Sequence, residues 1–363
     1  MLAKSFKVTM VQGRDAEKQT IAWRALSARA LVPSGYGAPE LLIPILAQAD
    51  AGVLEAVEQG GQLAFALVAQ PGRIYDQTPS SPLIASGLPH VAAEGAVEAL
   101  QAFLNSRTKP FLFKSVPTEG AFAVALETAA TRKFVLQTWA RAGLVLSGTY
   151  ETWLAENFDH KRRKELKRQR ARLSEQGELR LETLNQNSNL NGFVEDLLAL
   201  EAAGWKGERG TALKNDVSSL AAFRKAMENL HAAGKLRFWR LVLNGKAVAA
   251  LFAIVEGNEA WLGKIAYDEG FAKFSPGTLV ILDATESFFA EGGIVRVDSS
   301  AIPGHPMIER IWRDRIGFQD VLVAGPDVSA LGFQLVAWAL LAKQELRALA
   351  KSAFYLVSNR KRS

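Results

Sequence analysis

The 363-residue sequence contains no cysteine. This absence excludes a disulfide scaffold, cysteine metal ligands and a thiol nucleophile, and it fits a reducing compartment. Histidine is scarce too, with four residues far apart in the sequence: His90, His160, His231 and His305. No two of them have the spacing of a HExxH-type site, so we expect no metal cofactor.

Long apolar runs are also missing. The N-terminus lacks the apolar core of a signal peptide. Residues 330–342 form the longest apolar stretch near the end, but they include Gln334 and fall short of the roughly 20 residues that a bilayer requires. We therefore expect a cytoplasmic protein without a transmembrane segment, with a peripheral position at the inner membrane as the alternative.

The composition is that of a globular protein with a basic excess. Hydrophobic residues make up 48% and charged residues 22%, and the net charge is +6. At roughly 100–200 residues per domain, the length predicts two domains. The positive charge favours anionic partners such as CoA, other phosphates, nucleic acid or an anionic membrane, without choosing among them.

The first part of the chain mixes helical and strand signals. Helices are indicated near residues 22–30 and 91–103, and strands near residues 62–69 and 110–114. Between them, residues 72–89 are rich in Pro, Gly and Ser and are predicted to form a long loop.

The second half has clearer patterns. Residues 178–184 alternate as a strand does, and helical stretches follow at 192–203 and 216–233. Three strands are then predicted in an antiparallel meander, at residues 236–243, 246–255 and 259–267. The first turn is Asn244-Gly245, a strong hairpin signal, and the third strand is expected to be central in its sheet.

A helix is predicted to begin at Ser275-Pro276 and to end at Gly292-Gly293. Residues 294–298 then form a buried strand parallel to its neighbour, because a helical crossover leads to it. A helix over 306–315 and a last strand over 320–324 complete the order.

Three segments of this half resemble the CelD-type acetyltransferases, a GNAT family of bacterial proteins. They are Gly-Trp-Lys-Gly at 204–207, KIAYDEGFAKFSPG at 264–277 and DSSAIPGHPMIERIWRDR at 298–315. CelD-type proteins are similar in plan to FemAB-type proteins, which carry two GNAT-like halves. The resemblance is clear over about 150–325. It is faint before that, where Trp23, residues 62–69 and the loop 78–82 are compatible with a degenerate first half.

The resemblance implies an α+β protein with a tandem GNAT-like fold and a predominantly antiparallel mixed sheet. Residues 1–150 would be the degenerate half, 151–325 the acetyltransferase domain and 326–363 a basic amphipathic helix. The implied activity is transfer of an acetyl or other acyl group from acetyl-CoA or another acyl-CoA to an amine or hydroxyl. The acceptor would be a small molecule or saccharide, as in polysaccharide or envelope metabolism. A FemAB-like aminoacyl-tRNA-dependent transferase and a non-catalytic binding module are the alternatives.

The helix start at 275–278 is the predicted cofactor site. Free N–H groups and the helix dipole suit a pyrophosphate there, and a glycine allows close approach. GNAT enzymes place the CoA pyrophosphate at this helix under the pattern Q/R-x-x-G-x-G/A. Here Ala272 and Ser275 replace the first two motif residues. The implied cofactor-binding residues are Lys273, Ser275, Gly277 and Thr278, against the alternative of an ordinary capped helix.

Catalysis is expected in a slot between the strands 259–267 and 294–298, where GNAT enzymes hold the pantetheine arm. The acceptor needs a base and the leaving thiolate needs a proton. We predict His305 as general base, Asp298 as its orienting residue or an amine ligand, and Tyr267 as a further catalytic residue. The alternatives are a packing role for His305, a strand-end cap for Asp298 and a core position for Tyr267.

Six residues are predicted to bind substrate. Trp205 would form a wall, and Lys206 and Arg209 would hold a phosphate or carboxylate. The other three stand at the strand end or on the expected helix after His305: Asp268, Trp312 and Arg313. A surface loop with a buried Trp and a solvated helix face are the alternatives.

Two basic segments complete the predictions. Residues 160–172 hold eight Lys or Arg and one Glu, and Lys161, Lys164, Arg168 and Arg172 share a helical face. This face could meet an anionic surface or an acyl carrier, whereas the lack of interleaved aromatics argues against nucleic acid. Residues 331–357 are amphipathic and are expected to pack on the body, with a membrane surface as the alternative.

Overall fold

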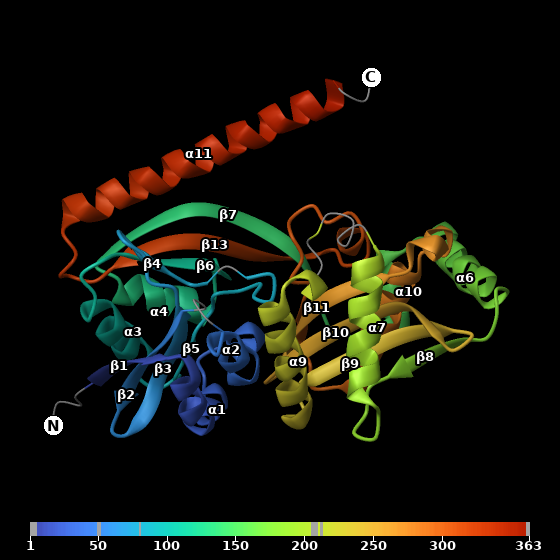
Figure 1. Cartoon of the computed structure of the whole chain (residues 1–363), viewed down its shortest axis with the longest axis horizontal. Helices are drawn as coiled ribbons and strands as arrows, with labels where there is room; N and C mark the ends of the chain where they lie inside the picture. Colours follow the sequence, from blue (N-terminus) through green and yellow to red (C-terminus); the bar gives the residue numbers. More distant parts are fainter. Residues whose placement is uncertain (1–5, 49–51, 80, 205–209, 211–212, 361–363) are drawn as a thin grey trace.

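A computed structural model describes residues 6–48, 52–79, 81–204, 210 and 213–360. The chain forms two lobes side by side, and a long C-terminal helix runs along one side of the molecule (Figure 1). Each lobe has helices packed on a sheet. The α+β class predicted from the sequence is confirmed.

The first lobe contains a four-stranded antiparallel sheet in the order β1-β2-β3-β5. Its strands are β1 (Phe6–Gln12), β2 (Val53–Gln59), β3 (Gln62–Ala69) and β5 (His90–Val91). The helices of this lobe are α1 (Thr20–Ser27), α2 (Pro39–Leu46), α3 (Ala96–Asn105) and α4 (Ala121–Ala129). Phe103 of α3 packs against Phe65 of β3 and against Phe111, which follows α3 in the chain.

A nine-stranded sheet joins the two lobes in the order β4-β6-β13-β7-β12-β11-β10-β9-β8. Its strands are β4 (Asp76–Gln77), β6 (Phe111–Pro117), β7 (Arg132–Val145), β8 (Leu179–Thr183), β9 (Leu236–Leu243), β10 (Lys246–Glu256), β11 (Glu259–Tyr267), β12 (Arg296–Asp298) and β13 (Asp314–Ala324). Among the described strands, only β4–β6 and β11–β12 are parallel pairs. The predominantly antiparallel sheet is therefore confirmed.

β13 lies between β6 and β7, although those two strands precede residue 150. The backbone of the second half thus completes the sheet of the first. The division at residue 150 remains a prediction, and any such boundary cuts through this shared sheet.

The meander of β9, β10 and β11 has the predicted bounds within a residue. Asn244 and Gly245 both have positive φ, at 50° and 79°, as a two-residue hairpin of this type requires. β11 lies between β10 and β12, so its predicted central position is also confirmed.

Helices cover both faces of the second lobe. α7 (Leu190–Ala203) and α9 (Val217–Ala232) bury Phe193, Phe223 and other apolar residues against one face. α5 (Tyr150–Asn157), α6 (His160–Ser174) and α10 (Pro276–Glu291) cover the other face. Apolar residues of this sheet therefore pack against helices on both faces.

The helix predicted over 306–315 is wrong. Residues Ile308–Arg310 form one short 3-10 turn, and β13 begins at Asp314. β13 pairs with β7 from Asp314–Gly143 to Ala324–Arg132. Residues 306–313 form turns that bury Ile308, Ile311 and Trp312, and only residues 314 and 315 join the ladder, so tertiary packing and pairing override the local charge pattern.

The C-terminal helix α11 (Ala330–Arg360) packs on β7 through its first three turns. Phe333, Val336, Ala337 and Leu340 are buried there beside Leu112 and Leu322. The expected packing on the body is thus confirmed for this part. Across the described residues, no helix combines the length and apolarity needed to cross a bilayer.

A buried charge network links the lobes. The Lys235 ammonium contacts Glu40 of α2 at 3.0 Å and Glu256 of β10 at 2.7 Å. Arg24 donates to the other Glu40 oxygen at 2.5 Å, and Ser27 donates to Glu256. Because both carboxylates are buried, the network fixes α1 and α2 against the second lobe.

His90 lies beside this network and is fully buried. Its Nδ1 accepts a hydrogen bond from the Trp23 indole at 3.0 Å. Burial, and then the charge of Lys235, lower the pKa of His90 from 6.5 to about 4. Between about pH 4 and pH 6.5, His90 is therefore mostly neutral in the folded state and mostly protonated in the unfolded chain.

This predicts acid sensitivity of the fold. The pKa is lower in the folded state, so the contribution of His90 is complete above pH 6.5 and is lost as the pH falls toward about 4. Each pH unit in this window should cost about 1.4 kcal/mol of unfolding free energy. Urea unfolding at several pH values should give a shallower slope for His90→Gln than for the unsubstituted chain. Equal slopes would contradict the prediction.

Candidate active site

The parallel pair of β11 and β12 is short. Glu259, Ala260 and Trp261 pair with Arg296, Val297 and Asp298, and β12 then ends. β11 continues to Tyr267, and within the described chain residues 262–267 pair only with β10. One edge of β11 is therefore open over six residues, at the place where the sequence predicted a slot.

The inner end of this open edge is fixed by a buried ion pair. Arg141 of β7 donates from Nη2 to Asp298 Oδ2 at 2.5 Å, and both side chains are about 95% buried. Arg141 also donates to the Ala85 carbonyl at 3.0 Å, and its guanidinium lies 3.9 Å from the centre of the Phe318 ring. Asp298 Oδ1 accepts the Ser300 amide at 2.8 Å. Asp298 thus holds the segment that leaves the sheet.

Tyr36 reaches this point from the first lobe. Its hydroxyl donates to the Leu262 carbonyl at 3.0 Å, on the first residue of the open edge. Burial raises the pKa of Tyr36 to about 12, so the hydroxyl keeps its proton at neutral pH. Ser300 lies near Tyr36 and has a left-handed backbone, with φ at 54°.

Sequence reasoning missed both Tyr36 and Arg141. The Gly35-Tyr36-Gly37 triplet was a usable signal, because glycines around one aromatic residue favour close packing of the backbone. A Cβ on Gly35 would lie 2.5 Å from the Trp261 ring, so this position needs glycine to seat Tyr36 against β11.

Two cavities flank the ion pair between the lobes. A cavity of about 110 Å³ is lined by Tyr36, Gly263, Lys264 and Ser300, together with apolar residues of α9 and β10. A larger cavity of about 420 Å³ is lined by Trp261, Asp298 and the charged residues Glu119, Glu259, Arg296, Asp314 and Arg315. Both cavities are formed by residues of both lobes.

Lys264 is a charged residue that lines the smaller cavity. Its ammonium contacts Glu201 of α7 at 2.8 Å, and both side chains are mostly buried. Glu201 also accepts the Leu213 amide at 3.1 Å. The cavity therefore combines an apolar body with one buried ion pair and two hydroxyl groups.

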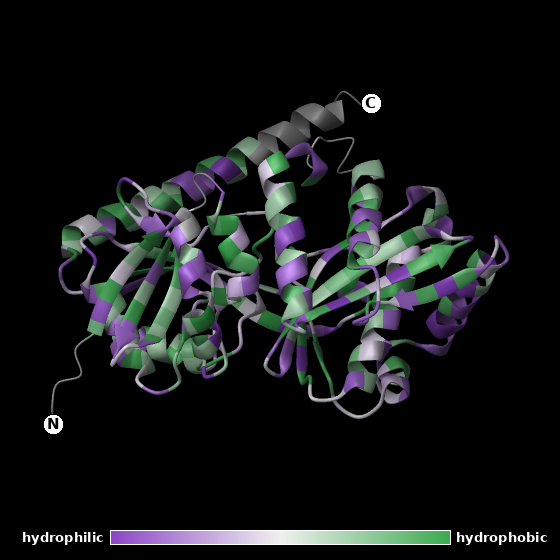
Figure 2. Cartoon of the chain, turned by 60° about the horizontal axis from the view of Figure 1, so that its bottom comes forward, coloured by the Kyte–Doolittle hydropathy of each residue, from purple (hydrophilic) through white to green (hydrophobic). Residues whose placement is uncertain are grey.

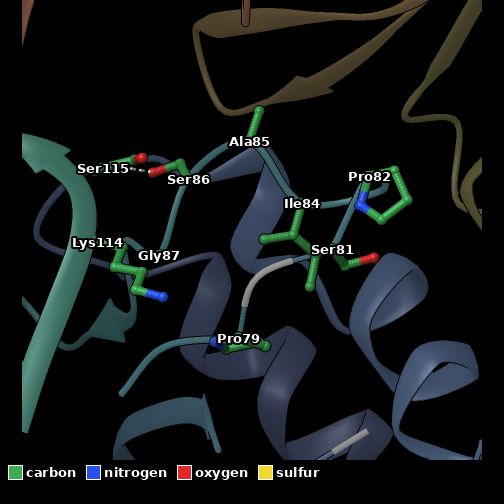
Figure 3. Close-up of a pocket in the computed structure, with 9 residues that line it drawn as sticks. All are labelled: Pro79, Ser81, Pro82, Ile84, Ala85, Ser86, Gly87, Lys114 and Ser115. Atoms are coloured by element: carbon green, nitrogen blue, oxygen red, sulfur yellow. Dashed lines mark hydrogen bonds between the residues drawn. The ribbon is translucent and has the colours of Figure 1, made fainter. Parts of the chain in front are cut away.

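A third cavity, of about 390 Å³, lies behind the loop that lines the small one. Figure 3 shows the loop residues that line it, among them Pro79, Ile84 and Gly87, with Lys114 and Ser115 of β6 on the other side, and Ser86 donates to the Ser115 carbonyl at 2.8 Å. Pro82, Ile84 and Ala85 line both this cavity and the small one. The loop thus separates the two.

The outer end of the open edge meets the start of α10. The helix begins where predicted, but Ser275 has φ at 54° and its side chain makes no capping hydrogen bond. The Ser275 amide donates to Ala272 and the Thr278 amide to Ser275. A Cβ on Gly277 would lie 2.9 Å from the Tyr267 ring and 3.1 Å from the Met307 sulfur. Side chains therefore cover this glycine.

Other predicted residues surround the same helix start. Lys273 is exposed, with its ammonium 4.9 Å from the Phe274 ring centre. Asp268 accepts the Gly270 amide at 2.9 Å and lies 3.6 Å from Lys246. His305 is half-buried, and its Nδ1 accepts the Met307 amide at 3.4 Å.

The structure therefore brings Tyr267, Gly277 and Met307 together and places Asp298 elsewhere. Asp298 pairs with Trp261, and six further residues of β11 lead to Tyr267. At roughly 3.4 Å per residue this separation is about 20 Å along the strand. The two predicted catalytic residues thus mark opposite ends of the open edge.

Trp312 does not fit its predicted role in substrate binding. It is fully buried, and its indole donates to Thr285 of α10 at 3.1 Å. A direct contact with substrate needs surface that this side chain lacks. Arg313 is exposed in the turn before β13. Trp205, Lys206 and Arg209 lie outside the described residues.

The basic helix α6 is part of the fold. Arg170 pairs with the mostly buried Asp283 of α10, whose pKa is raised by burial against the opposing effect of Arg170. The face with Lys161, Lys164, Arg168 and Arg172 is exposed. Among the described residues, no group of His, Asp and Glu could hold a metal ion.

Breaking the ion pair between Arg141 and Asp298 should lower the free energy of unfolding by a measurable amount. Asp298→Asn leaves the buried Arg141 charge without a counterion, which should lower the unfolding free energy by roughly 3 kcal/mol. The matched control Glu259→Gln weakens the half-exposed Arg296 pair at the other end of β12 and should cost less than about 1 kcal/mol. Urea unfolding measures both. Equal losses would contradict the prediction.

Residues 160–302 match the family model described as an acetyltransferase (GNAT) domain. No curated protein matches the sequence.

Several solved structures share the whole fold at low identity. The C-terminal domain of a putative lysylphosphatidylglycerol synthetase from Agrobacterium fabrum has a TM-score of 0.55 and 13% identity, over 90% of this chain and 97% of that one. L-PGS from Bacillus licheniformis has a TM-score of 0.54 and 12% identity, over 91% and 98%. FemX has a TM-score of 0.54 and 11% identity, over 91% and 100%. At such identities the likeness shows the fold alone. Residues 160–302 are therefore similar to an acetyltransferase (GNAT) domain, and the chain shares its two-lobed fold with FemX.

Proposed function

We propose that the protein transfers an acetyl or other acyl group from a CoA-type thioester to an amine or hydroxyl, along the open edge of β11. The observation that carries this proposal is the end of strand pairing at Trp261–Asp298. It leaves an unpaired edge that runs from the start of α10 to the cavities between the lobes.

The open edge suits the extended arm of such a donor. A strand edge presents N–H and C=O groups that can bond an extended amide-containing chain as an added strand does. The Leu262 carbonyl already accepts a hydrogen bond from Tyr36. The arm would therefore bind beyond that point, toward Tyr267. The donor phosphates would then lie near Lys273, and the thioester near the small cavity.

The acceptor would approach from the cavities between the lobes. Its nitrogen or oxygen attacks the thioester carbon, the carbon–sulfur bond breaks, and one proton passes from the acceptor to the leaving thiolate. At the inner end, the Tyr36 hydroxyl is protonated, and it would donate to the sulfur by turning its single hydrogen away from the Leu262 carbonyl. Asp298 acts as a positioning residue, because Arg141 and Ser300 occupy its oxygens. His305 and Tyr267 remain candidates for proton transfer at the outer end.

One observation favours a second donor, an aminoacyl-tRNA. Tyr267 and Met307 cover Gly277, and the amides of Ser275 and Thr278 are used within the loop. Fewer groups are therefore left for a pyrophosphate, while α6 presents an exposed basic face to an anionic donor. Loss of activity on ribonuclease treatment would identify this donor.

Acetyl-CoA binding to the full chain tests the first proposal. Calorimetry should show binding, and Lys273→Glu should weaken it about tenfold, because the exposed charge near α10 is reversed. Lys7→Glu, an equally exposed substitution on β1 of the first lobe, should leave binding unchanged. Absence of binding, or equal effects of both substitutions, would contradict a CoA donor at this helix.

Turnover tests the role of Tyr36. Tyr36→Phe removes the hydroxyl at the inner end and should slow release of free CoA from acetyl-CoA about tenfold or more while leaving acetyl-CoA binding intact. Mass spectrometry of a mixture of candidate amines identifies the acylated product. Binding with no turnover on any acceptor would instead support a non-catalytic module.

A further inference from the structure

Helix α11 has two apolar faces on opposite sides. One face, with Phe333, Val336, Ala337 and Leu340, is buried against β6, β7 and β13. The other comprises Leu331, Leu335, Trp338, Leu346 and Leu349, which are 53–67% exposed. The spacing of these five residues returns to the same side of a helix with 3.6 residues per turn, about 180° from the buried face.

The exposed face is long, with one acidic residue, Glu345, within it. It runs from residue 331 to residue 349, which corresponds to about 27 Å of helix at 1.5 Å per residue. Figure 2 shows apolar bands recurring along α11 between polar ones, and Figure 1 shows the helix along the rim of the molecule, diverging from the second lobe. A monomeric protein in water rarely leaves such a row of large side chains uncovered.

Positive charge accompanies this face. Residues 330–363 contain six Lys or Arg and one Glu, against a net charge of +6 for the whole chain. Lys343 and Arg347 are exposed on α11, close enough to Lys114 of β6 to lower its pKa along with burial. Arg132 and Lys133 share a cavity of about 350 Å³ with Trp338. Helix α11 thus carries a row of exposed apolar side chains, and basic side chains lie on its other sides and on the neighbouring strand β7.

We propose that α11 docks the protein onto an anionic lipid bilayer, with the row from Leu331 to Leu349 lying in the lipid headgroup region. Large apolar residues with a Trp on one side and basic residues on the rest are typical of helices that lie in a membrane interface. Lys and Arg near an anionic surface add electrostatic attraction.

Charge favours the bilayer over a second copy of the chain. Two copies of α11 placed face to face would bring two strongly basic segments together, which opposes association. An anionic surface instead neutralises this charge while covering the apolar row. The bilayer also requires no change in the packing of Phe333, Val336 and Leu340 on the body.

Sedimentation with vesicles tests the proposal on the full chain. The protein should bind vesicles of phosphatidylglycerol and phosphatidylcholine, and should bind pure phosphatidylcholine vesicles at least tenfold more weakly. Leu335→Ser with Trp338→Ser should lower binding about tenfold or more, because two exposed apolar anchors are lost. Lys343→Gln, Arg347→Gln and Lys351→Gln together should lower binding to the anionic vesicles in particular.

The matched control is Ile21→Ser with Val217→Ser. These apolar residues are 81% and 80% exposed, but lie on α1 and α9, and their substitution should leave vesicle binding unchanged. Circular dichroism and a thermal melt check that each variant is folded. Failure of the unsubstituted chain to bind anionic vesicles would overturn the proposal. So would a dimer in light scattering that Leu335→Ser with Trp338→Ser converts to monomer without any effect on vesicles.

Discussion

The ion pair between Arg141 and Asp298 is the interaction on which the rest of the site depends. It joins the last residue of β12 to β7, across the boundary between the lobes. Asp298 also bonds the Ser300 amide, so the chain turns away from β11 at this residue. Without that turn, a longer β12 could pair with the rest of β11 and close its edge. Burial of both charges makes the arrangement costly to disturb.

The same interaction explains why two lobes are needed for one site. Arg141 comes from the first half of the chain, and Tyr36 from the first lobe bonds the first residue of the open edge. The network of Glu40, Lys235 and Glu256 then holds α2 against β9 and β10. The first half is therefore part of the cavity wall, even where its sequence shows little of the GNAT pattern.

Local sequence signals were reliable where the structure is stabilised locally. The Asn244-Gly245 hairpin, the helix bounded by Pro276 and Gly292, and the basic helix from His160 all form where predicted. Each depends on backbone conformations or spacings within a few residues. The pyrophosphate site at Gly277 was argued from the same signals. They could not show that Tyr267 and Met307 pack over it, because both come from other elements.

The sequence by itself determined the second lobe: its meander, its crossover helix and its resemblance to GNAT acetyltransferases follow from periodicity and short motifs. Only the tertiary structure decided that short turns before β13 replace the expected helix, that Trp312 belongs to the core and that Arg141 meets Asp298. The physical reason is sequence distance. Arg141 and Asp298 are 157 positions apart, and no local pattern encodes which distant strand will supply a backbone partner or a counterion.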